Sequence, residues 1–165
     1  MRPHQVFAAM PPERAAAFFR GLAESAPGAF QQALLAASAA LKSRPQYLMK
    51  QPFDKRAAAV RRALSRVAAD TIAEEMLAVY FLECRKELLV EWLDGLGIEH
   101  DSGTLQETVP AEPTAVKLGQ AVETFRRADD DSDRELLLRA FAAQSAIDWP
   151  ALDALLSSPP GTSSS

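Results

Sequence analysis

The spacing of apolar residues along the chain predicts helices almost throughout. Alternation of β-branched residues, the mark of a strand, never lasts four positions, whereas apolar residues recur three and four positions apart. Prolines and glycines separate these runs, where they start and end helices. The expected helices begin at Pro12 and then cover residues 28–42, 53–67, 70–96, 113–127, 133–146 and 149–156. We therefore predict an all-α protein, a compact bundle of six or seven helices.

The segment 70–96 is predicted to be the centre of this bundle. It reads "DTIAEEMLAVYFLECRKELLVEWLDGL", and its apolar residues surround most of the circumference of a helix. A helix of that kind is packed against neighbours on several sides. The Met and aromatic residues of the segment suit a hydrophobic core, and the alternative is that they line a ligand cavity.

The stretch "EWLDGLGIEHDSGTLQ" marks the end of this central helix. Gly95 and Gly97 stand where a helix C-cap needs a left-handed residue, and Ile98 can fold back onto the helix. "DSG" is a turn composition, with Gly103 supplying a positive φ. The long connection 98–112 leaves an alternative open, in which the flanking "IEH" and "TLQ" could pair as a short two-stranded hairpin. Every residue has a structural role in this interpretation except His100.

His100 and Asp101 form a candidate ligand site. Three observations argue against a metal site there. Adjacent side chains diverge, and a metal site generally needs three or four ligands. The one other histidine, His4, falls in an N-terminus expected to be loose. We therefore predict that His100 belongs to a turn, and that the chain holds no metal and no cofactor.

The acidic run "DDDSDRE", residues 129–135, resembles a calcium-binding loop in its alternating aspartates only. Arg134 occupies the position where that loop needs glycine, and Ala140 stands where it needs a bidentate glutamate. Ser132 and Glu135 have the spacing of a capping box. The run is therefore predicted to begin a helix.

The charge is divided unevenly along the chain, although the net charge is only −4. Residues 1–67 hold eleven Lys/Arg and three Asp/Glu, a net +8, and residues 68–165 hold seven and nineteen, a net −12. Such a division is typical either of a basic binding surface or of two halves that attract each other in a monomer or dimer.

The segment 42–66 concentrates the positive charge, with Asp54 as its single acid and with Tyr47 and Phe53 among the cations. Its candidate partner-binding residues are Lys42, Arg44, Lys50, Lys55, Arg56, Arg62 and Arg66. On a helical wheel Arg62 and Arg66 each lie within about 20° of Lys55. The apolar residues predicted to lie on the opposite, buried side are Phe53, Val60, Leu64 and Val67.

Known enzyme signatures are missing from the sequence. It has no phosphate-binding glycine loop, no nucleophile elbow, no zinc-protease motif and no paired cysteines. Cys84 is single, so no intramolecular disulfide can form, and a small buried residue is the expected role. We see no signal peptide and no membrane span, so a cytoplasmic protein is expected.

These observations favour a non-enzymatic protein that acts by binding another protein or a second copy of itself. The first alternative is a nucleic-acid-associated protein that uses the segment 42–66. The second is an enzyme or small-ligand binder whose cavity is lined by the central helix, with His100 at its mouth. One domain is expected over residues 1–157, followed by a mobile Pro/Ser-rich tail at 158–165.

Overall fold

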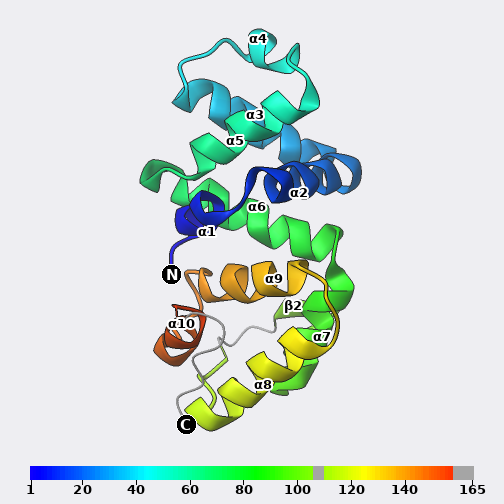
Figure 1. The fold of residues 1–165 in the computed structure, drawn as a ribbon, viewed down its shortest axis with the longest axis vertical. Helices are drawn as coiled ribbons and strands as arrows, with labels where there is room; N and C mark the ends of the chain where they lie inside the picture. Colours follow the sequence, from blue (N-terminus) through cyan, green and yellow to red (C-terminus); the bar gives the residue numbers. More distant parts are fainter. Residues whose placement is uncertain (106–109, 158–165) are drawn as a thin grey trace. The chain divides into compact units, whose positions relative to one another are not determined.

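The all-α prediction is confirmed. A computed structural model describes residues 1–105 and 110–157, and in these ranges it holds ten α-helices and one two-stranded sheet (Figure 1). By its internal contacts the chain divides into two compact units, Arg2–Lys86 and Met1 with Glu87–Ser165, called here the N-terminal and C-terminal units. The predicted tail at 158–165 lies outside the described residues, and the single domain stays a prediction.

The N-terminal unit is a bundle in which α6 lies against α1, α2, α3 and α5. Its helices are α1 (Pro3–Ala9), α2 (Pro12–Ser25), α3 (Pro27–Ala40), α4 (Pro45–Met49), α5 (Phe53–Leu64) and α6 (Asp70–Glu83), with a 3₁₀ turn at Val67–Ala69. The first four each begin with proline, whose fixed φ and missing N–H suit a first helical turn. α3 and α5 lie side by side, and α4 adjoins α3 (Figure 1).

Aromatic rings fill the centre of this unit. Phe18 of α2 stacks on Tyr80 of α6 at 4.2 Å between centroids, and Phe7 of α1 meets Phe18 edge-on at 5.5 Å. Gly21 lies at the contact between α2 and α6, where a Cβ would make an ordinary van der Waals contact of 3.4 Å with the Tyr80 ring. The Cys84 thiol donates to the Gly21 carbonyl at 3.4 Å, so this half-buried cysteine is part of the same helix contact.

The helix predicted over 70–96 is two helices, α6 and α7 (Lys86–Leu96). The amides of Cys84 and Arg85 both donate to the carbonyl of Tyr80, at 2.8 and 3.3 Å, which interrupts the regular hydrogen-bond ladder between them. The apolar residues of α6 are buried in the N-terminal unit. Those of α7 belong to the C-terminal unit, so one apolar run in the sequence serves two cores.

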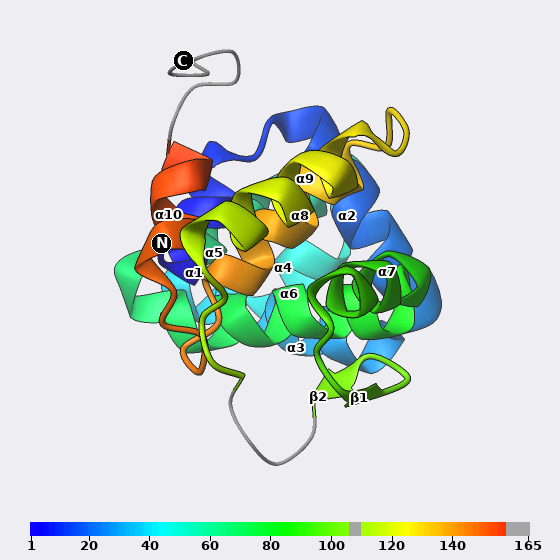
Figure 2. The ribbon, with the colours of Figure 1, turned by 90° about the horizontal axis from the view of Figure 1, so that it is seen from below.

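The C-terminal unit is built on aromatic contacts between α7 and the helices α8 (Ala115–Arg127) and α9 (Asp133–Ala142). The unit also holds β1 (His100–Asp101), β2 (Thr104–Leu105) and α10 (Pro150–Ser157). Trp92 meets Phe125 of α8 and Phe141 of α9 edge-on, at 5.5 and 5.8 Å. α8, α9 and α10 contact one another (Figure 2).

Two short helices, α1 and α4, were not expected from the sequence. The N-terminus was predicted to be loose, which is wrong: Val6 and Phe7 of α1 are buried, and the His4 ring lies 2.7 Å from the Asp70 carboxylate. Seven and five residues respectively are too few for helical periodicity to be recognised. Both helices depend on tertiary contacts, because isolated helices of this length are unstable.

Candidate functional site

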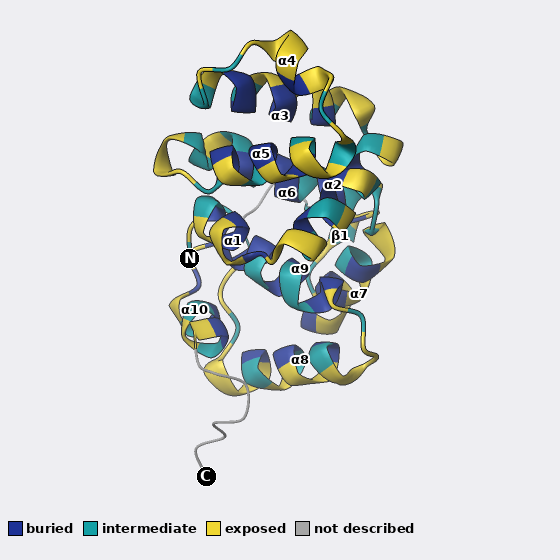
Figure 3. Ribbon diagram, turned by 45° about the horizontal axis from the view of Figure 1, so that its top comes forward, coloured by how far each residue is buried: buried dark blue, intermediate teal, exposed yellow. Residues whose placement is uncertain are grey.

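The turn into α4 presents the first of the basic candidates. Lys42 takes a left-handed conformation, φ 55°, and reverses the chain after α3. Arg44 is extended, as the residue before a proline prefers, and Pro45 then begins α4. Leu48 is the one buried residue of this helix, so it holds α4 against the bundle, and the other residues of α4 are exposed (Figure 3).

Five exposed residues of this turn and helix form what we call the α4 patch: Lys42, Arg44, Tyr47, Met49 and Lys50. Tyr47 and Met49 keep 63% and 43% of their area exposed, and they are two residues apart in the same short helix, so they add apolar surface to one place. Within residues 2–86 none of the three cations forms an ion pair, and the sequence holds no acid between positions 25 and 53. The patch therefore joins apolar surface to uncompensated positive charge.

The α5 candidates divide into exposed and structural residues. Lys55 and Arg62 are exposed, as predicted for a solvent face. Arg56 is half-buried and its guanidinium lies 5.3 Å from the centre of the Phe53 ring, as does that of Arg20. Cation–π contacts of this kind stabilise the fold. Arg56 is therefore occupied within the N-terminal unit.

The predicted basic face of Lys55, Arg62 and Arg66 is broken in the structure. α5 ends at Leu64, and Arg66 is extended, with its Nη1 donating to the Ala40 carbonyl at 2.7 Å. Placing Arg66 on the wheel of this helix was therefore wrong. Val67, predicted in the buried stripe, is 66% exposed for the same reason.

The "EHD" stretch forms the predicted corner and hairpin. Gly97 has φ 71°, and the Ile98 amide donates to the Leu93 carbonyl at 3.0 Å, which closes the end of α7 as a Schellman motif. Asp101 pairs with Thr104 in an antiparallel ladder. Positive φ at both intervening residues gives the turn preferred by two-residue hairpins. The corner, the cap at Gly97 and the hairpin are therefore present, whereas the cap role predicted for Gly95 is wrong, because Gly95 lies inside α7 and is helical.

His100 has a structural role, whereas the sequence had indicated none for this residue. Its Nε2 lies 2.7 Å from the Asp94 carboxylate, and its Nδ1 accepts the Gly103 N–H at 3.0 Å. The side chain is 11% exposed, and the acceptor role of Nδ1 places the proton on Nε2. Both ring nitrogens are thus engaged, while Asp101 is exposed. In the ranges that the structure describes, no three His, Cys, Asp or Glu side chains gather as metal ligands.

The "DDDSDRE" run begins α9, as predicted, but its cap differs. Asp131 accepts the Asp133 amide at 3.0 Å, whereas the Ser132 side chain makes no capping hydrogen bond. Glu135, expected in a capping box, receives a bidentate pair from Arg126 at 2.7 and 2.7 Å. Aspartate two positions before the helix therefore performs the capping.

Arg134 is the residue that sequence reasoning missed. It is 6% exposed and donates to Asp129, to Glu91 and, at 3.2 Å, to the Phe125 carbonyl. Hydrogen bonds with Asp129, and then with Glu91, raise the pKa of Arg134 above its already high value, so the group stays charged. No short sequence motif predicts this role, because the hydrogen-bond partners of Arg134 stand five, nine and 43 positions away in the sequence.

The α4 patch is the candidate site that surface exposure and charge identify among the described residues. No helix among the described residues is long and apolar enough to cross a membrane. No family model, no curated protein and no solved structure matches the chain.

Proposed function

We propose that this protein acts by binding another protein through the α4 patch. The observation that carries the proposal is that Tyr47 and Met49 stand exposed among three cations that form no ion pair within residues 2–86. Aromatic residues, Met and Arg are enriched at protein interfaces. Met suits such a surface because its flexible side chain adapts to the shape of a partner.

The chemistry of the patch defines the partner as an apolar segment flanked by Asp or Glu. Lys42, Arg44 and Lys50 form no ion pair within residues 2–86, so no internal carboxylate competes with those of a partner. Complementary charge of this kind accelerates association and selects among partners. The charge of the whole unit agrees, since residues 2–86 hold thirteen Lys/Arg and seven Asp/Glu.

Nucleic-acid binding is the second candidate, favoured by the exposure of Lys55 and Arg62 on α5. Phosphate binding is driven by counterion release and scales with the number of free cations. Arg56 and Arg66 are engaged within the protein, which leaves fewer cations for phosphates than the sequence indicated. The exposed apolar area of the α4 patch also has no role on a phosphate backbone.

Selection of peptides on the immobilised full-length protein tests the proposal. Peptides that bind are selected from a random library and labelled. Each is then titrated against wild type, Tyr47→Ser, Lys50→Glu and the control Lys55→Glu. We expect acidic peptides with apolar residues, whose affinity falls about tenfold or more in the two patch variants and is unchanged in the control. All four proteins should keep the same thermal midpoint, because these side chains are exposed.

Three outcomes would overturn the proposal. The first is a set of selected peptides without acidic residues, or with equal affinity for all four proteins. The second is binding of a labelled DNA duplex at about 150 mM salt that is lost on reversal of Lys55 and Arg62. The third is a dimer in sedimentation that Tyr47→Ser abolishes, which would assign the patch to self-association.

A further inference from the structure

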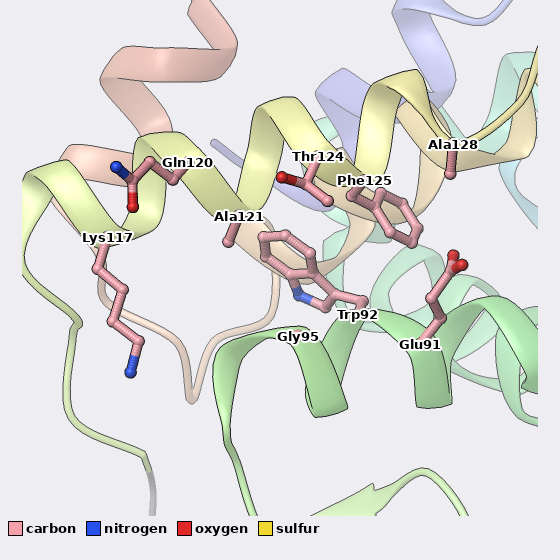
Figure 4. Close-up of a pocket in the computed structure, with 9 residues that line it drawn as sticks. All are labelled: Glu91, Trp92, Gly95, Lys117, Gln120, Ala121, Thr124, Phe125 and Ala128. Carbon is pink, nitrogen blue, oxygen red and sulfur yellow. The ribbon is translucent and has the colours of Figure 1, made fainter.

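The facing surfaces of α7 and α8 leave a groove of about 410 Å³ within the C-terminal unit. Figure 4 shows Trp92 in its middle, with Lys117 and Glu91 at opposite ends. The lining residues of α8 recur three and four positions apart from Lys117 to Phe125, so they share one face of the helix. The volume lies in the range of sites that hold small organic molecules.

Gly95 keeps the α7 side of this groove open. Its backbone is helical, and a Cβ built on it would meet no heavy atom within 4 Å. The neighbouring helix therefore does not fill the space that glycine leaves. A larger side chain at this position fits the backbone and would occupy the groove.

Trp92 supplies the groove with a polar group that lacks a partner. The residue is 1% exposed and its ring contacts Phe125, yet the indole Nε1–H has no acceptor among the described residues. Buried polar groups are nearly always hydrogen-bonded, so each exception calls for an explanation. Trp149, the other tryptophan, follows the rule, because its Nε1 donates to the Pro110 carbonyl at 3.3 Å.

The charges at the two ends of the groove are not equivalent. Lys117 is exposed and forms no ion pair among the described residues of the C-terminal unit, so its ammonium is free to bind a ligand. Glu91 is already bound by Arg134. The groove is therefore lined by a solvent-exposed ammonium and by a tryptophan whose covered N–H lacks an acceptor, beside aromatic and small apolar residues.

We propose that the α7–α8 groove binds a small organic carboxylate with a planar apolar body. The carboxylate is held by Lys117, a second acceptor atom of the ligand receives the Trp92 N–H, and the body lies against Trp92 and Phe125. The Nε1 atom is covered in the empty groove, so binding includes a local shift of side chains that uncovers it. The groove lies in the C-terminal unit and shares no residue with the α4 patch. The test of protein binding at that patch therefore neither supports nor contradicts this proposal.

Nuclear magnetic resonance of the two indole N–H groups tests this inference directly. The probes are 3-(pyridin-3-yl)propionate, whose ring nitrogen is the second acceptor, its neutral amide and the cationic 3-(pyridin-3-yl)propylamine. We expect the carboxylate to shift the Trp92 indole resonance while the Trp149 resonance stays fixed. The two signals are assigned with Trp92→Phe and Trp149→Phe.

Variants then separate the groove from non-specific binding. Lys117→Gln should weaken carboxylate binding about tenfold or more, and Gly95→Leu should abolish it by filling the groove. Lys55→Gln, an exposed lysine of the other unit, is the matched control and should bind as wild type does. Circular dichroism checks that each variant keeps its helices.

The inference is overturned if the Trp92 resonance does not move at about 10 mM probe, which corresponds to less than about 3 kcal/mol of binding free energy. It is equally overturned if the three probes bind alike, or if the carboxylate binds Gly95→Leu as well as wild type. Movement of the Trp149 resonance alone would place the ligand elsewhere and would also contradict it.

Discussion

The guanidinium of Arg134 donates to both carboxylate oxygens of Asp129, from Nε at 2.8 Å and from Nη2 at 3.1 Å. The same group donates to Glu91 of α7 and lies 4.7 Å from the centre of the Phe125 ring of α8. One side chain near the start of α9 thus joins three helices and the connection between α8 and α9. This makes Arg134 a structural centre of the C-terminal unit.

Replacement of Arg134 by Ala should lower the free energy of unfolding by about 2–4 kcal/mol, because several hydrogen bonds to charged groups and a buried stack are lost together. Glu91 and Asp129 are about half exposed, so water solvates the carboxylates left behind, which keeps the loss below that of a fully buried pair. Urea denaturation measures the change.

Two control variants test whether the loss of stability in Arg134→Ala comes from its hydrogen-bond network. Arg134→Lys should recover only part of the loss, because an ammonium cannot form the bidentate pair or the planar stack. Arg127→Ala removes an exposed pair with Glu123 one turn away, which is worth less than about 1 kcal/mol. Equal losses at Arg134 and Arg127 would show that the network does not stabilise the unit.

His100→Ala should destabilise the hairpin, by about 0.5–2 kcal/mol, since it removes two hydrogen bonds from a nearly buried side chain. Hydrogen exchange gives the sharper measurement, because the Gly103 amide loses its acceptor and should exchange faster. Asp101→Ala, at the exposed neighbour, is the control and should leave that amide protected. Unchanged exchange at Gly103 in His100→Ala would contradict the assigned role.

The elements that local chemistry specifies were predictable from the sequence. Gly97 and Gly103 are needed where the backbone turns left-handed, and the structure places positive φ at both. The helices after Pro12 and Pro52 follow from the same local reasoning, because proline begins a helix whose apolar stripe comes next. These signals lie within a few residues of the feature that they determine.

The features decided by distant residues were not predictable. The interruption at Cys84 contains neither proline nor glycine, and it divides an apolar run between two units. The role of Arg134 depends on Glu91, 43 positions earlier. Exposure of Tyr47 and Met49 depends equally on tertiary packing, because in a five-residue helix periodicity cannot tell which side chains face inward.

The core of the C-terminal unit is tested by two leucines of the same helix. Leu93 is fully buried and Leu89 only partly, so Leu93→Ala should cost about 2–5 kcal/mol and Leu89→Ala clearly less. The sequence alone ranks them together, since both fall in the apolar run of the segment 70–96. Thermal or urea unfolding of the pair, with circular dichroism as the signal, checks the order. A larger loss for Leu89→Ala would contradict the orientation of α7.

The pH dependence of stability should depend on Asp70 at the start of α6. Burial alone raises the pKa of this carboxyl, but hydrogen bonds from the His4 amide and ring and from Arg2 lower it and outweigh burial. The pKa of Asp70 in the folded protein therefore lies below its ordinary value. A depressed folded pKa adds stability above the unfolded pKa, near pH 4, and this stability is lost as the pH falls through the folded value.

Asp70→Asn should accordingly cost about 1–3 kcal/mol near pH 7, from lost hydrogen bonds to a charged group. The difference from wild type should shrink as the pH falls below about 4, because protonation removes the same charge from the native protein. Asp54→Asn is the control: that carboxylate is 81% exposed and 3.7 Å from Arg20, so its removal should change stability little at any pH. Urea titrations at several pH values measure both variants. A constant difference between Asp70→Asn and wild type down to about pH 2.5 would show that the charge of Asp70 does not carry the contact between α1 and α6.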